Sequence, residues 1–248
     1  MRGLIFAMLI GLLPGVAVAA DCREVTFDGV GFTTCEVDLT QEDLRLFLRD
    51  EAGEVLGQFS RVEANLPPGQ RLGFATNGGM YREDRRPVGL YIEDGQQEHG
   101  LVTAAGPGNF GMLPNGVFCI MPGQARVIET MAYLRAPPNC RDATQSGPML
   151  VIDGALHPRF RENSTSRNIR NGVGVDASGT RAYFAISNTA VNFHLFARFF
   201  RDFLGVGNAL YLDGRVSRLY SRDLGRRDYG LWLGPILGTV VDEAASAQ

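Results

Sequence analysis

Short apolar or alternating runs, each ended by glycine, proline or a small polar residue, recur along most of this chain. The 31 glycines supply turns between the runs, because glycine adopts backbone angles that other residues avoid. A run of about 4–8 residues with this punctuation is typical of a β-strand. We therefore expect strands near 24–27, 33–39, 43–48, 71–76, 88–93, 116–121, 125–133, 148–153, 172–177, 181–187 and 208–212.

Two segments have a helical pattern. Over 192–204, apolar residues recur at intervals of three and four positions around two arginines, and Gly205 then ends the helix. A shorter candidate over 54–65 ends before Pro67-Pro68. Many strands with one main helix predict an α+β fold, in which a mixed, mostly antiparallel sheet core carries that helix and a few short ones.

The beginning of the chain has the order of a secretory signal peptide. Arg2 is followed by an apolar stretch over 4–16 and then by small residues. We predict a signal over 1–20 and a single exported domain over 21–248, located in the periplasm or secreted. Since no later stretch approaches the roughly 20 apolar residues of a membrane helix, we expect no membrane contact once the signal is removed.

The four cysteines are Cys22, Cys35, Cys119 and Cys140. An exported protein meets an oxidising environment, so they are expected to form two disulfides, for which three pairings are possible. We favour Cys22 with Cys35 and Cys119 with Cys140, because each pair closes a short local loop. No Cys-x-x-Cys spacing is present, which argues against metal or redox use of these thiols.

The charge of the chain limits its partners. The formal net charge is −3, whereas binding to a nucleic-acid backbone needs a clear basic surplus, so no nucleic acid is expected. All 24 basic residues are arginines. Any anion site must therefore use the planar guanidinium group, which can donate two parallel hydrogen bonds. No feature of the sequence predicts an oligomeric state.

Polar residues stand at the ends of several predicted strands, where a side chain is held rigidly and the adjoining loop is accessible. Asp213 is the most informative, because it ends an apolar strand with a carboxylate. Polar residues at several strand ends of one sheet can meet in a single cleft. The stretches after a strand are Asn77-Gly78-Gly79, Ser187-Asn188 and Asp213-Gly214, and those just before one are Ser146-Gly147 and Arg167 with Arg170.

Each of these residues also has a structural explanation. Asp213-Gly214 between two extended runs is a common hairpin turn, and Asn77 is a residue type that tolerates a left-handed turn. Arg167 and Arg170 can be solvated loop charges. His194, near the start of the apolar helix, can be a buried hydrogen-bonded residue. The residues alone leave both explanations open.

Four short motifs follow one another along the chain: Asn77-Gly78-Gly79, Gly147-Pro148, Arg170 with Gly174, and Leu212-Asp213-Gly214. In this order they resemble the phosphodiester glycosidases related to the uncovering enzyme, N-acetylglucosamine-1-phosphodiester alpha-N-acetylglucosaminidase. The likeness covers roughly residues 70–220. That family commonly continues Leu-Asp-Gly with more glycines and a serine. Here Arg215-Val216 stand before Ser217, which changes the shape of the loop and adds a cation.

The resemblance implies hydrolysis of the bond between a sugar and a phosphate. Asp213 would be the carboxylate that stabilises or attacks the oxocarbenium-like sugar. Arg170 would bind the phosphate, with Arg167 or Arg218 assisting, because a guanidinium matches its oxygens. His194 would be the general acid or base if it faces the cleft. The substrate is then a carbohydrate phosphodiester, in a cell-surface or exogenous polysaccharide.

The same resemblance implies a wider set of substrate contacts. Asn77, Ser187 and Asn188 would hold sugar hydroxyls or phosphate oxygens. The other expected contacts are Gly78, Gly79, Ser146, Gly147, Gly214 and Ser217. Asp213, Asn77 and Asn188 offer oxygen ligands that calcium or magnesium accepts, but no loop spells a calcium-binding pattern. We expect no cofactor and no obligatory metal.

Two other functions fit the same residues. A secreted module that binds carbohydrate or phosphate without cleaving it is one, because Arg215-Val216 alter the loop that follows Asp213. A phosphodiesterase that cuts on the other side of the phosphate is the second. It would release a sugar phosphate in place of a free sugar.

Overall fold

The computed structural model describes residues 20–213 and 216–242. Within them, the strands β1–β17 form three antiparallel sheets. The seven-stranded sheet has the order β1 (Asp21–Phe27), β2 (Val30–Asp38), β13 (Arg181–Ser187), β12 (Asn171–Val175), β14 (Asn208–Asp213), β10 (Met149–Ile152) and β11 (Ala155–Leu156). The β4 sheet has the order β16 (Arg226–Arg227), β15 (Leu219–Ser221), β4 (Gln70–Asn77), β17 (Ile236–Asp242) and β3 (Asp43–Phe47). The β9 sheet has the order β6 (Gln96–His99), β5 (Tyr91–Glu93), β9 (Asp142–Ser146), β7 (Gly116–Met121) and β8 (Gln124–Glu129).

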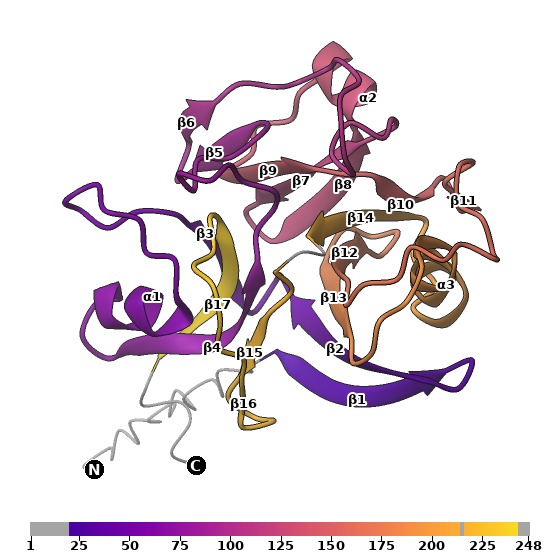
Figure 1. The fold of residues 1–248 in the computed structure, drawn as a ribbon. Helices are drawn as coiled ribbons and strands as arrows, with labels where there is room; N and C mark the ends of the chain where they lie inside the picture. Colours follow the sequence, from indigo (N-terminus) through magenta and orange to yellow (C-terminus); the bar gives the residue numbers. More distant parts are fainter. Residues whose placement is uncertain (1–19, 214–215, 243–248) are drawn as a thin grey trace, which may run out of the picture.

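The three sheets enclose one apolar core. In Figure 1 the β9 sheet lies above the other two, which stand beside each other below it. Each sheet contributes a buried phenylalanine: Phe74 from β4, Phe118 from β7 and Phe184 from β13. The ring centroid of Phe184 is 5.0 Å from that of Phe74 and 5.9 Å from that of Phe118. These contacts join the sheets through large apolar side chains, whose burial is strongly favourable.

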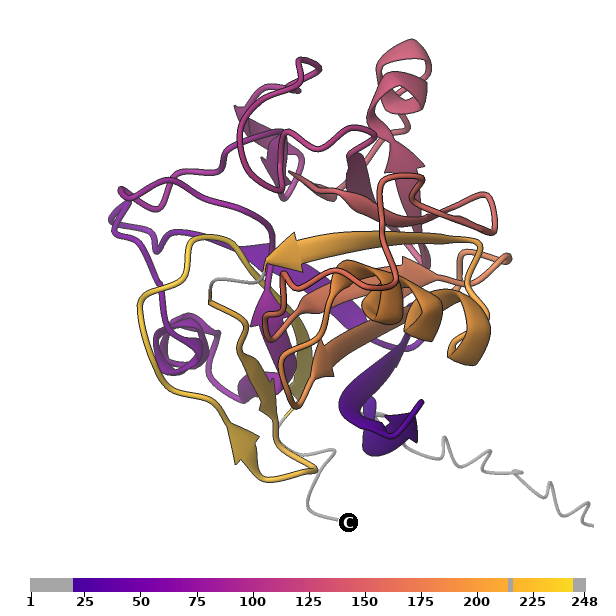
Figure 2. The same ribbon diagram turned by 45° about the vertical axis from the view of Figure 1, so that its right-hand side comes forward.

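The longest helical segment covers the outer face of the seven-stranded sheet (Figure 2). It consists of α3 (Phe193–Arg198) and a π-helical continuation, η1 (Phe199–Phe203). Asn192 caps its start, because its side chain accepts a hydrogen bond from the Leu195 amide at 2.9 Å. Phe199 stacks on Phe32 of β2 with 4.1 Å between ring centroids. The helix predicted over 192–204 is thereby confirmed.

The predicted α+β class with a mostly antiparallel core is also confirmed, but local boundaries differ. The strand expected over 125–133 ends at Glu129, where the Glu129 side chain caps α2 (Thr130–Arg135). The other short helix, α1, spans Phe59–Asn65 and so begins later than expected. The sequence analysis missed β9, because its buried residues are mostly polar and give no apolar pattern. Hydrogen bonds of these polar side chains, and not the burial of apolar side chains, stabilise the strand in the fold.

Both predicted disulfides are present. Cys22 and Cys35 lie directly opposite each other in β1 and β2, and Cys119 in β7 is joined to Cys140. Of the signal peptide predicted over 1–20, only Ala20 belongs to the described residues. Within the described ranges, every helix is too short or too polar to cross a membrane.

Glu42, in the turn between β2 and β3, generates a prediction about pH. Its Oε1 accepts a hydrogen bond from the Asp38 amide at 2.9 Å, while its buried Oε2 has no hydrogen-bond partner. Burial, together with the charges of Asp38 and Glu36, raises the pKa of Glu42 from 4.5 to about 7. The folded chain therefore binds more protons than the unfolded chain between these pH values, and stability falls as pH rises through them.

Glu42→Gln cannot ionise and should escape this loss. We expect it to exceed the wild type by about 2 kcal/mol in unfolding free energy at pH 8, after allowance for solvent screening. At pH 4 the two should be alike. Urea unfolding at both pH values measures the difference, with Glu51→Gln on an exposed turn as the control. An equal stability of Glu42→Gln and wild type at pH 8 would contradict the prediction.

Candidate active site

The ends of β4, β12 and β14 are tied together by two buried amide side chains. Asn171 donates from Nδ2 to Asn77 Oδ1 at 2.8 Å, across the boundary between two sheets. The Oδ1 of Asn171 accepts from the Asp213 backbone amide, also at 2.8 Å. Asn77 Oδ1 accepts a second bond from the Arg218 amide at 2.8 Å, and its Nδ2 donates to the Val216 carbonyl. Asn77 is extended within β4, so it is not a left-handed turn residue.

The third sheet reaches the same place through β9. Thr144 Oγ1 donates to the Gly78 carbonyl at 2.5 Å, which links β9 to the end of β4. Ser146 Oγ donates to the Leu212 carbonyl at 2.9 Å, which links β9 to the end of β14. Ser146 is fully buried, so its hydroxyl positions a strand. All three sheets therefore meet where β4, β9 and β14 end.

Glycine is required at this meeting point because the strands approach closely. Gly79 has a φ of +124°, and a Cβ placed on it would lie 2.4 Å from Thr144 Oγ1. A Cβ on Gly147 would lie 2.6 Å from Asn115 Cβ. Both distances are far shorter than a normal contact. Gly79 therefore makes room for Thr144 of the β9 sheet, Gly78 beside it makes room for the backbone of Pro235, and Gly147 makes room for Asn115 just before β7.

Asp213 is half-buried at the end of β14 and lines a cavity of about 470 Å³. We call this space the Asp213 cavity. Its wall combines charged, polar and apolar groups. It is formed by Met80, Tyr81, Arg82, Glu83, Arg85, Val88, Pro107, Gly108, Asn109, Phe110, Asp213, Val216 and Leu231.

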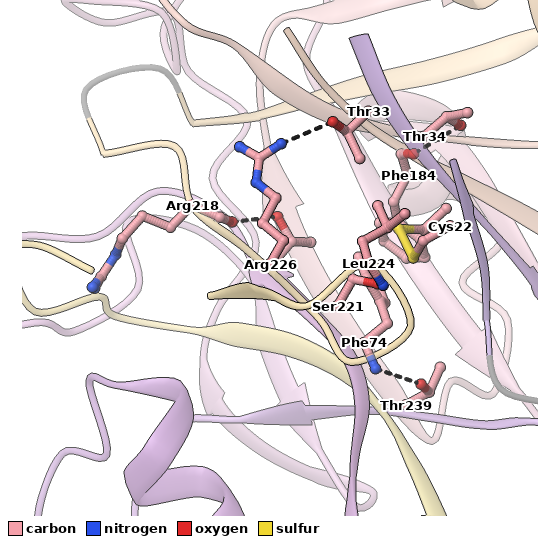
Figure 3. Close-up of a disulfide and its surroundings, with 12 residues drawn as sticks. Cys22, Thr33, Thr34, Phe74, Phe184, Arg218, Ser221, Leu224, Arg226 and Thr239 are labelled. Atoms are coloured by element: carbon pink, nitrogen blue, oxygen red, sulfur yellow. Dashed lines mark hydrogen bonds between the residues drawn. A yellow bond between two sulfur atoms is a disulfide. The ribbon is translucent and has the colours of Figure 1, made fainter. Parts of the chain in front are cut away.

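A second, more open space of about 1170 Å³ lies next to it, and we call it the Arg226 cavity. Val216 lines the first cavity, and the next residue, Ser217, lines the second. Arg226 points toward Thr33, whereas the Arg218 side chain extends away from them (Figure 3). The second cavity is lined by Ser187, Asn188, Ser217, Arg218, Arg226, Asp228, Tyr229 and neighbouring residues.

Two predicted contacts in the Arg226 cavity have protein partners. Asn188 is exposed, and its Oδ1 accepts hydrogen bonds from Thr33 Oγ1 at 3.0 Å and Arg226 Nη1 at 3.2 Å. Ser187 is fully buried, and its hydroxyl accepts a bond from the Arg170 backbone amide at 3.0 Å. Asn188 is thus accessible to a ligand, whereas Ser187 holds the backbone before β12.

Arg170 is fully buried and is not a solvated loop charge. Its guanidinium donates to the carbonyls of Val191 at 2.9 Å and Ser166 at 3.1 Å, and to the Tyr211 hydroxyl at 3.3 Å. Its guanidinium carbon also lies 3.6 Å from the centre of the Phe193 ring. Burial lowers the pKa of Arg170 and raises that of Tyr211. Arg170 lines neither cavity, and its contacts join the segments at Ser166 and Val191 to Tyr211 of β14.

The other predicted residues lie in different surroundings. His194 is half-buried on α3, Arg167 is exposed on the loop before β12, and neither lines one of the two cavities. Ser217 donates to the carbonyls of Ile169 and Asp213, at 3.0 Å each. Gly214 lies outside the described residues. Among the described residues, no cluster of three or more His, Cys, Asp or Glu side chains is arranged to hold a metal ion.

Asn171 is the most important residue that the sequence analysis did not single out. It stands next to Arg170, and neighbouring side chains on a strand point to opposite faces. Only one of the two could therefore face the end of β4, and the structure shows that Asn171 does. This alternation of side chains along β12 is the sequence signal from which Asn171 could have been identified.

The sequence profile of the phosphodiester glycosidase family matches residues 70–226, which is more than half of this chain. The matched segment contains all the strand ends described above. This chain belongs to the phosphodiester glycosidase family. A second comparison finds a relative that matches most of the chain. The uncharacterized protein YigE of Escherichia coli (strain K12) is 36% identical over 211 residues, covering 85% of this chain and 82% of YigE.

Solved structures share the fold of this phosphodiester glycosidase family member. The catalytic domain of zebrafish N-acetylglucosamine-1-phosphodiester alpha-N-acetylglucosaminidase, auto-inhibited by its pro-peptide, superimposes with a TM-score of 0.58 at 16% identity. The match covers 88% of this chain and 81% of that domain. A hypothetical protein from Synechocystis gives a TM-score of 0.55 at 14% identity. That match covers 90% of this chain but only 62% of the Synechocystis protein.

The amide link between sheets can be tested by mutation. Asn171→Ala removes the partner of the Asp213 amide and one partner of Asn77 Oδ1. Because these groups are buried or partly buried, we expect the unfolding free energy to fall by about 2–4 kcal/mol. Asn188→Ala, at an exposed position, should cost less than about 1 kcal/mol. Denaturant unfolding measures both, and equal losses would refute a special role for Asn171.

Proposed function

We propose that this protein is an exported hydrolase that releases a sugar from a sugar-1-phosphodiester, in a cell-surface or exogenous polysaccharide. One observation carries the proposal. The family's strand ends converge so that Asp213, held through its backbone amide by Asn171, lines a cavity. A carboxylate held at the wall of a cavity can stabilise or attack the oxocarbenium-like sugar that forms in glycoside hydrolysis.

In the proposed reaction, Asp213 acts on the anomeric carbon of the bound sugar. As the bond to the phosphate oxygen breaks, positive charge develops on the sugar, and the carboxylate stabilises or attacks it. A water oxygen then bonds to the anomeric carbon, one water proton passes to the released phosphate, and the products are a free sugar and a phosphomonoester. Phosphate is already a fair leaving group, so little proton donation to its oxygen is required. We assign His194 no step, because it does not line the Asp213 cavity.

Other residues are proposed to position this carboxylate. Asn77 and Asn171 fix the ends of their strands, and Ser146 fixes the carbonyl of Leu212. Arg170 supports the wall through Tyr211, which lies two residues before Asp213. Such supporting groups contribute to catalysis because small errors in position reduce the rate steeply. Asn188, in the neighbouring Arg226 cavity, is a candidate for contact with a second part of the polysaccharide.

The decisive test is the replacement Asp213→Asn. We expect the release of free sugar from a sugar-1-phosphodiester to fall by about 10²–10⁴-fold, because the amide cannot stabilise or attack the developing cation. Product analysis should quantify free sugar, phosphomonoester and sugar phosphate separately. Asp202→Asn, an exposed acid after α3, is the matched control and should retain the wild-type rate.

Three outcomes would change the conclusion. A wild-type rate for Asp213→Asn would remove the carboxylate from the mechanism. Release of sugar phosphate without free sugar would favour the phosphodiesterase. Saturable binding of the phosphodiester with no product after hours would favour the binding module.

Catalysis is also proposed to be independent of metal. Incubation with EDTA followed by gel filtration should leave the rate of sugar release within about twofold of the untreated protein, since Asp213 and protein hydrogen bonds supply the chemistry. The assay compares treated protein with and without added Ca²⁺ or Mg²⁺. Loss of activity on chelation and its return with either ion would show that a metal takes part.

A further inference from the structure

We propose that Arg82 and Arg85 form the subsite for the substrate's phosphate group, on the wall of the Asp213 cavity. This inference rests on the proposed function and deepens it. It moves the phosphate contact from Arg170, which is buried, to the loop that follows Asn77-Gly78-Gly79.

The loop that carries both arginines is held as a tight hairpin. Tyr81 pairs with Pro87 as an isolated β-bridge. Inside it, the Arg82 amide donates to the Arg86 carbonyl at 2.8 Å, and the Arg85 amide donates to the Arg82 carbonyl at 2.9 Å. The backbone that presents the two guanidinium groups is therefore well defined.

The charges on this loop are unevenly compensated. Arg86 Nε donates to Asp84 Oδ2 at 2.6 Å, so that arginine is neutralised by its neighbour. Among the residues that the structure describes, neither Arg82 nor Arg85 forms an ion pair. Glu83 on the same loop leaves residues 82–86 with one net positive charge, and the guanidinium groups of Arg82 and Arg85 are the ones that can pair with a ligand in the cavity.

The Arg85 side chain is also oriented for binding. Its guanidinium carbon lies 5.3 Å from the centre of the Tyr81 ring, and the residue is half-buried. Tyr81 is fixed in turn, because its hydroxyl donates to the Trp232 carbonyl at 3.2 Å. Stacking on a ring leaves the edges of a guanidinium group open, and these edges carry the N–H groups that bind oxygen anions.

Three other described arginines that line the Arg226 cavity already have protein acceptors. Arg226 makes bonds of 2.9–3.3 Å to the Asp228 carboxylate, and Arg227 Nη2 lies 3.5 Å from a Glu63 carboxylate oxygen. Arg218 donates to Gln58 Oε1 at 3.0 Å and to the Leu231 carbonyl. A phosphate at any of these sites would have to displace a protein acceptor.

The lining of the Asp213 cavity fits a singly charged phosphodiester. Glu83 and Asp213 balance the two guanidinium groups, so the wall as a whole is close to neutral. The arginines extend from the loop after β4, whereas Asp213 ends β14. Phe110 adds a buried apolar surface, which strengthens charge interactions by excluding water. The sugar can then lie against the carboxylate with its phosphate on the guanidinium groups.

Phosphate binding to the intact protein tests this subsite. We expect Arg82→Gln and Arg85→Gln each to raise the dissociation constant for inorganic phosphate about tenfold, because each removes a charged donor. Arg86→Gln, on the same loop but paired with Asp84, is the matched control and should change it less than twofold. Calorimetric titration gives the constants, and circular dichroism verifies the fold of each variant.

The same variants separate this inference from the proposed function. Unchanged phosphate affinity in Arg82→Gln and Arg85→Gln, or an equal loss in Arg86→Gln, would overturn the subsite, even if sugar release by the wild type is observed. Phosphate affinity that depends on Arg82 and Arg85 would support it, even if no sugar phosphodiester is hydrolysed. With an active enzyme, the two variants should also raise KM for the phosphodiester about tenfold, whereas Arg86→Gln should not.

Discussion

The hydrogen bond between Asn77 and Asn171 is the contact on which the proposed site depends. It joins the β4 sheet to the seven-stranded sheet at the point where their strands end. Through the other end of the Asn171 amide, it also fixes the backbone of Asp213. An amide side chain suits this position because it donates and accepts at once. Loss of either partner would leave buried polar groups unpaired, at a cost of about 1–3 kcal/mol each.

The glycines and small hydroxyl residues around this bond follow from the meeting of three sheets. Strand ends expose backbone carbonyls that need donors, and Thr144 and Ser146 provide them. Side chains can approach the backbone this closely only where a Cβ is missing, as Thr144 does at Gly79 and Asn115 does at Gly147. The family's short motifs therefore mark a packing junction, and Asp213 is the group that this junction presents to a cavity.

Arginine supplies all 24 Lys and Arg positions of the chain, and besides the arginines that pair with carboxylates there are two other kinds of arginine site. Arg170 shows the first kind, because it is buried and donates to neutral oxygens behind the cavity wall. Arg85 shows the second, because it stacks on Tyr81 and has no carboxylate partner among the described residues. The planar guanidinium group permits both arrangements. Only the second leaves the charge available to a phosphodiester.

Local periodicity, short spacings and ordered motifs were sufficient to predict the antiparallel α+β class, the main helix, both disulfides and the family. Tertiary structure decided which strand-end residues meet. Asn171 reaches Asn77 while its neighbour Arg170 faces away, since side chains alternate along a strand and the pairing of sheets selects one face. The polar strand β9 and the burial of Arg170 against Val191 and Tyr211 likewise depend on partners far along the chain, which no local pattern records.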